Sequence, residues 1–169
     1  MSSVEQMCRE WTHNWFGFYV FDKRQEGGDY RFSDLPVVTS FVDSSWDYSR
    51  ETELLKYLEA SLCCAAPTLP TDHRCLLCNE MLPTDRYHWD GMWLWPASLA
   101  HYVATHSIGL PERMVAHIEK EDFKPPVQVQ PVSLEKLPWP PVVQNAGAWA
   151  RFKLLFAKRA PAGVPPKGG

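Results

Sequence analysis

The 169-residue sequence predicts a small α+β domain that ends in a proline-rich, partly disordered tail. Three observations predict this fold class. Leucines recur at helical spacing after Ser49, an Asp-Gly pair separates two apolar stretches near residue 90, and the fifteen prolines concentrate after Lys124. Apolar residues make up 45% of the chain, which is enough for a packed core.

Residues 1–70 are expected to form the first part of the body. Residues 11–21 are rich in aromatic side chains and have the composition of a strand, and a glycine-containing turn can lead into a second strand at 30–32. Residues 37–42 follow Pro36, which can open either a helix or an edge strand, so both alternatives stay open.

A helix is predicted after Ser49, because leucines recur at spacings of three and four between residues 54 and 62. Ser49 is the candidate N-cap. Glu51 and Glu53 would lie in the first turn, where negative charge favours the helix dipole.

Residues 71–122 contain a metal-ligand pattern. Cys75 and Cys78 have two residues between them, and after a gap of 22 residues His101 and His106 follow with four residues between them. Two thiolates and two imidazoles are a ligand set of closed tetrahedral structural zinc sites, so we predict that these four residues bind one zinc ion. The candidate substitutes for any one ligand are Cys63, Cys64, His73 and His88.

A hairpin and a helix are predicted between the two halves of this pattern. A two-residue Asp90-Gly91 turn joins the strands of the hairpin. Alternation places Trp93 and Trp95 on one face, with Trp89 across from them.

The helix of this module is expected to begin at Pro96, which suits a first helical position. Its apolar residues Leu99, Tyr102 and Val103 are predicted to form the core of the module together with the two alternating tryptophans, rather than a ligand pocket. His117 is predicted to face solvent on the next helix.

Residues 90–106 match the pattern D-G-x-W-x-W-P-x-x-L-x-H-Y-V-x-x-H, and Leu110-Pro111 follows. This pattern resembles that of an uncharacterised family of small, mostly bacterial proteins, in which a C-x2-C precedes it too. The resemblance covers roughly a quarter of the chain and implies no activity.

Residues 123–169 are predicted to form the proline-rich tail, which either wraps over the body or is disordered. A short amphipathic helix is expected at 146–160. Residues 149–159 combine an apolar face with basic residues, which would allow contact with the body, a partner protein or a membrane surface. The apolar face consists of Trp149, Phe152, Leu155 and Phe156.

Charge disfavours nucleic-acid recognition by the body. Residues 1–120 carry 10 basic and 17 acidic side chains, a net charge of −7, whereas residues 121–169 carry 7 basic and 3 acidic, a net charge of +4. An acidic body is a poor match for a phosphate backbone. The H-E-x-x-H motif of zinc proteases is absent.

We therefore expect a non-enzymatic, zinc-stabilised binding or scaffolding protein whose partner is a protein. The alternative is a nucleic-acid-associated, zinc-finger-like protein that uses its basic tail, and the third hypothesis is a metal hydrolase. The five cysteines are odd in number, and we expect metal-bound thiolates in a reducing, intracellular location, the cytoplasm or nucleus. No apolar run is long enough to predict a transmembrane segment.

Overall fold

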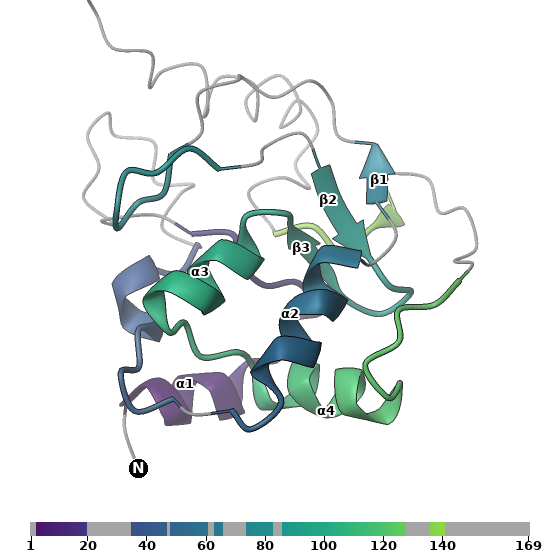
Figure 1. Cartoon of the computed structure of the whole chain (residues 1–169), viewed down its shortest axis with the longest axis horizontal. Helices are drawn as coiled ribbons and strands as arrows, with labels where there is room; N and C mark the ends of the chain where they lie inside the picture. The colour runs from purple at the N-terminus through teal and green to yellow at the C-terminus, as the bar shows by residue number, and fades with distance from the viewer. Residues whose placement is uncertain are drawn as a thin grey trace, which may run out of the picture.

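The computed structural model describes residues 3–19, 35–46, 48–60, 63–65, 74–82, 86–127 and 136–140. Within these residues the chain forms α-helices and a three-stranded sheet, which confirms the α+β class. Figure 1 shows α1 and α4 side by side at the bottom of the view, α2 and α3 above them, and the sheet at the upper right. The elements are α1 (Ser3–Glu10), η2 (Val38–Phe41), α2 (Glu51–Ala60), β1 (Cys63–Ala65), β2 (Arg86–Trp89), β3 (Leu94–Pro96), α3 (Leu99–His106) and α4 (Glu112–Lys120).

The sheet is antiparallel in the order β1-β2-β3, and β2 and β3 form the predicted hairpin. The loop between β2 and β3 contains four residues, 90–93, so the predicted two-residue Asp90-Gly91 turn was wrong. The carboxylate of Asp90 shapes this connection by accepting hydrogen bonds from the backbone N–H groups of Met92 at 2.8 Å and Trp93 at 2.6 Å. The longer loop sets the register, so that His88, and not Trp89, lies across from Trp95.

Pro96 is the last residue of β3 rather than the first of a helix, which corrects a second prediction. It pairs with Tyr87 on a strand at the edge of the sheet, where a residue without an N–H group is tolerated. Helix α3 begins three residues later at Leu99, with Ser98 as its N-cap residue.

The strand predicted at residues 11–21 is wrong over the described part, 11–19, which has only a single bridge from Trp15 to Leu94. Two backbone hydrogen bonds of 3.0 Å join this irregular segment to β3, from Leu94 N to Asn14 O and from Phe16 N to Leu94 O. Gly17 has a φ of +86°, and a Cβ there would lie 3.0 Å from Pro96 Cδ, so the segment turns where only glycine fits. The second predicted strand, at 30–32, lies outside the described residues.

The aromatic side chains of this segment pack against one another instead of alternating across a sheet. Trp11 makes edge-to-face contacts with Trp15, Phe16 and Phe41, at centroid distances of 4.9, 5.3 and 5.8 Å. Phe41 belongs to η2, so residues 38–41 form a short 3-10 helix and not an edge strand, and Val42 after it makes a single bridge to Ile108.

Helix α2 begins at Glu51, two residues after the predicted N-cap, and buries Leu54, Tyr57 and Leu58. The helical spacing therefore predicted this helix correctly. Its observed start lies about one residue later than the predicted cap implies. Both acidic residues expected in the first turn, Glu51 and Glu53, are there.

The predicted core of the metal module is confirmed. Each of its five side chains is at most 2% exposed. Trp95 also donates a hydrogen bond from Nε1 to the carbonyl oxygen of Leu58 at 3.1 Å, which ties the sheet to the end of α2. The five residues are Trp93, Trp95, Leu99, Tyr102 and Val103.

Residues 136–140 of the predicted tail lie against the body. Leu137 and Trp139 are buried, and the Trp139 ring meets Tyr87 edge-on at a centroid distance of 5.0 Å and Phe18 at 6.2 Å. The tail was predicted either to wrap over the body or to be disordered, and this short part wraps over the body. The helix expected at 146–160 lies outside the described residues.

A buried carboxylate joins the hairpin to two helices. The Asp90 side chain is fully buried, and its Oδ2 accepts a hydrogen bond from the Tyr57 hydroxyl at 2.9 Å and lies 3.2 Å from His117 Nε2. The prediction of a solvent-facing His117 was wrong, because this contact turns the ring inward and leaves the side chain 15% exposed.

Replacing Asp90 by Asn is expected to lower the free energy of unfolding by about 1–3 kcal/mol, because an amide has one acceptor oxygen where the carboxylate has two. If the amide oxygen faces the loop, Tyr57 and His117 lose the acceptor. If it faces these two side chains, the loop N–H groups lose theirs. Urea denaturation measures the change, with Glu59→Gln on the exposed face of α2 as the matched control. Equal stability of both variants would show that the buried carboxylate does not join these elements.

Candidate metal centre

Residues 74–82 form a tight loop that turns two cysteines to one side. The Cys75 N–H donates to Glu80 O at 2.8 Å, and the Asn79 N–H donates to Cys75 O at 3.1 Å. Asn79, directly after the second cysteine, has a φ of 63°, a left-handed conformation that asparagine tolerates. The Leu77 N–H points at the Cys75 sulfur at 3.4 Å, so the loop backbone supports negative charge on that atom.

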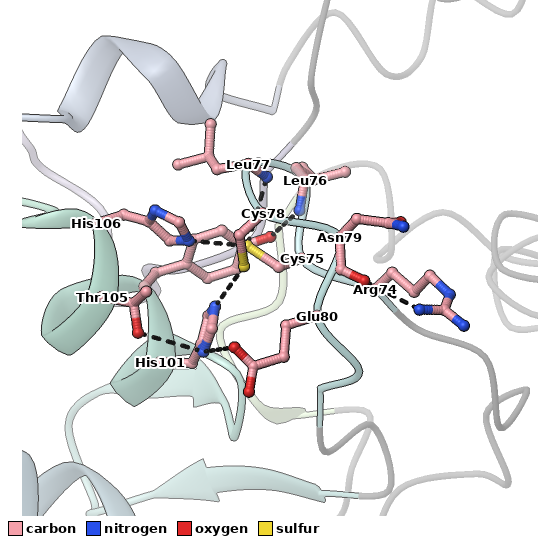
Figure 2. A network of polar contacts seen from close by, with 11 residues as sticks. Arg74, Cys75, Leu76, Leu77, Cys78, Asn79, Glu80, His101, Thr105 and His106 are labelled. Atoms are coloured by element: carbon pink, nitrogen blue, oxygen red, sulfur yellow. Dashed lines mark hydrogen bonds and ion pairs between the residues drawn. The ribbon is translucent and has the colours of Figure 1, made fainter.

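Helix α3 supplies two imidazoles to the same place, from His101 in its first turn and His106 at its last residue. The Cys75 sulfur lies 3.2 Å from His106 Nε2, and the Cys78 sulfur lies 3.4 Å from His101 Nε2. The four donor atoms all lie within 4.8 Å of one another (Figure 2). The structure thus brings together all four residues that the spacing singled out, in a group that can hold a metal ion.

Further side chains support the donors from outside this group. Glu80 Oε2 and Thr105 Oγ1 lie 3.8 and 3.5 Å from His101 Nδ1, on the side of the ring away from the cysteines. Partners of this kind orient histidines that bind metals. The Tyr102 hydroxyl accepts the Leu76 N–H at 3.0 Å and so fixes the loop to the helix. Spacing could not reveal these contacts, because they depend on how the loop is placed against α3.

The electrostatics of the group favour uncharged donors when no cation is present. Burial, followed by the charge of neighbouring His101, lowers the pKa of His106. A hydrogen bond from the Glu80 backbone lowers the pKa of Cys78, but the partial desolvation of its exposed sulfur and the adjacent Cys75 thiol outweigh it, and the pKa is raised. A bound divalent cation would relieve this repulsion and hold both sulfurs as thiolates.

The proposed substitute ligand His88 is not part of the group. It is buried on β2, where its ring stacks on Trp95 at a centroid distance of 5.7 Å. Over the residues that the structure describes, the four-residue group is the one set of His, Cys, Asp or Glu side chains that can hold a metal. His73 and the side chains of Cys63 and Cys64 lie outside the description.

No family model, curated protein or solved structure matches this chain. The resemblance of residues 90–111 to an uncharacterised family therefore stays a prediction. Among the helices of the described ranges, none is long and apolar enough to cross a membrane. Function has to be inferred from the geometry of the site itself.

Proposed function

We propose that this protein binds one zinc ion through Cys75, Cys78, His101 and His106, and that the ion stabilises a non-enzymatic domain that binds or scaffolds another protein. The observation that carries the proposal is the convergence of two sulfur and two nitrogen donors within 4.8 Å. Two thiolates and two imidazoles are a common complement of structural zinc.

The donor distances fit a tetrahedral zinc ion. Zinc–sulfur bonds of about 2.3 Å and zinc–nitrogen bonds of about 2.0 Å, in a tetrahedron, separate sulfur from nitrogen by roughly 3.5 Å. The two sulfur–nitrogen distances are 3.2 and 3.4 Å. The ion therefore fits between the donors with only small side-chain adjustments.

The surroundings favour a structural role over a catalytic one. Four protein ligands complete the tetrahedron, whereas a catalytic zinc keeps a position for water or substrate. A cavity of about 300 Å³ lies beside α1 and η2, with Met7, Trp11 and Phe41 among its lining residues, and none of the four proposed ligands lines it. These features disfavour the metal hydrolase hypothesis.

The exposed face of α3 disfavours base recognition. Its large apolar residues are buried against the body, and the exposed positions near the histidines are Ala104 and Thr105, which carry no basic or amide group. Helices that read DNA place such groups against base edges. The nucleic-acid alternative then depends on the basic tail, and it predicts salt-sensitive binding to DNA or RNA, which the scaffold proposal does not.

Metal analysis of the purified protein tests the proposal. We expect about one zinc per wild-type chain and almost none in Cys75→Ser, because a hydroxyl is a poor replacement for a zinc-binding thiolate. The control is Cys8→Ala, which removes a buried thiol outside the group and should keep its zinc. Wild-type protein without zinc, or Cys75→Ser with a full complement, would contradict the proposal.

A further inference from the structure

The two cysteines of the metal centre differ in their access to solvent. Cys75 is 4% exposed, and its sulfur is approached by the Leu77 N–H. Cys78 is exposed. The sulfurs lie within 4.8 Å of each other, and each would be a thiolate on zinc. One accessible thiolate next to a shielded one is the arrangement of an attacking and a resolving cysteine.

We propose that the metal centre is a peroxide-sensitive switch, in which Cys78 reacts first, Cys75 resolves it, and the resulting disulfide expels the zinc. This inference depends on the zinc site proposed above and adds a means by which zinc binding at that site is regulated. The reactive species is the exposed thiolate, and the oxidant is hydrogen peroxide or an alkyl hydroperoxide.

The reaction balances in two steps. The Cys78 thiolate attacks the terminal peroxide oxygen, the O–O bond breaks, and Cys78 becomes a sulfenic acid, while hydroxide leaves from hydrogen peroxide or an alkoxide leaves from an alkyl hydroperoxide. The Cys75 thiolate then attacks the Cys78 sulfur, the S–S bond forms, the S–O bond breaks, and hydroxide leaves. Two electrons pass from the two sulfurs to the peroxide, and the zinc loses both thiolates and keeps only two imidazoles.

The loop geometry makes this disulfide accessible. A disulfide needs its sulfurs at about 2.05 Å, and two sulfurs already within 4.8 Å on one tight loop require only side-chain rotation and a small backbone adjustment. After the zinc leaves, a single hydrogen bond within the described residues, from Leu76 N to the Tyr102 hydroxyl, remains between the loop and α3. We therefore expect oxidation to destabilise the domain as removal of the zinc does, and reduction to reverse the effect.

Cys8, the third cysteine whose side chain the structure describes, should not compete with Cys78 for the peroxide. Cys8 is buried, and burial, followed by the charges of Asp43 and Glu112, raises the pKa of its thiol to about 12. It stays protonated at neutral pH, and a thiol without thiolate character reacts slowly with peroxide.

The test uses the zinc-loaded full chain treated with hydrogen peroxide. A chromophoric chelator follows zinc release, and peptide mapping by mass spectrometry locates the new bond. We expect release of the bound zinc in step with a Cys75–Cys78 disulfide, and recovery of zinc binding after reduction. Protein that carries zinc but keeps it under peroxide would overturn this inference alone, whereas protein that never carries zinc would overturn the proposed function as well.

A matched variant separates the switch from general oxidative damage. Cys78→His keeps four zinc ligands but has one thiolate, so no disulfide can form within the site, and we expect zinc release to slow by on the order of tenfold or more. Cys8→Ala should behave as wild type. Zinc release from the wild-type protein with a disulfide at Cys63 or Cys64, and without a Cys75–Cys78 bond, would also overturn the inference. This outcome can be read even if Cys78→His fails to bind zinc.

Discussion

Removal of zinc with a chelator is expected to abolish the cooperative thermal unfolding transition of the wild-type protein. Zinc binding at structural sites contributes roughly 10 kcal/mol or more, which is comparable with the whole stability of a small domain. The ligands belong to the loop and to α3, and buried Cys75, Leu82 and Tyr102 extend from these two elements into the core. Without the ion the contact between loop and helix loses most of its stabilisation.

Differential scanning calorimetry and near-ultraviolet circular dichroism of chelated protein measure this effect. Zinc added back should restore the transition, and magnesium, which prefers oxygen ligands, should not. A metal-free protein that melts at an unchanged temperature would show that the four side chains do not form a structural site.

Trp95→Ala is expected to lower the free energy of unfolding by about 3–5 kcal/mol, the range for truncating a large buried aromatic residue. Trp95 is fully buried and stacks between His88 and Tyr57, at centroid distances of 5.7 and 6.1 Å. The substitution opens a cavity between the sheet and α2 and removes the hydrogen bond to Leu58 O.

Urea denaturation measures the loss, with Met92→Ala in the hairpin loop as the control, because Met92 is 36% exposed and its truncation should change stability little. The zinc content of Trp95→Ala should stay near that of wild type while the domain remains folded, because Trp95 is not a ligand. A loss below about 1 kcal/mol would show that this ring is not central to the core.

The metal ligands and the core of the module could be predicted because both depend on short-range spacing. Ligands with two and with four residues between them are placed by one loop and one helix, and apolar residues at helical spacing share a face wherever the helix packs. The same reasoning found α2, whose leucines follow a clear period.

The elements that were missed depend on contacts between distant parts of the chain. The predicted elements do not include α1, because its three core-facing residues, Val4, Met7 and Cys8, fall at helical spacing over only eight residues, which is too short a pattern to stand out in the sequence. The pairing of His88 with Trp95 follows from a loop shaped by the Asp90 side chain, and a turn motif alone does not reveal that length. His117 was misplaced because its partner lies 27 residues away.

The long-range attachment of residues 3–19 has a consequence for folding kinetics. Arg9 bonds to Glu112 across 103 residues, and Arg113 donates to Thr12 O across 101 residues. Chain entropy must be lost before such contacts form, and proteins dominated by non-local contacts fold slowly. The N-terminal helix packs on both η2 and α4, so its contacts are complete only after α4 has formed. We therefore expect its docking to be a late event on the folding pathway, after the hairpin and α3 have come together.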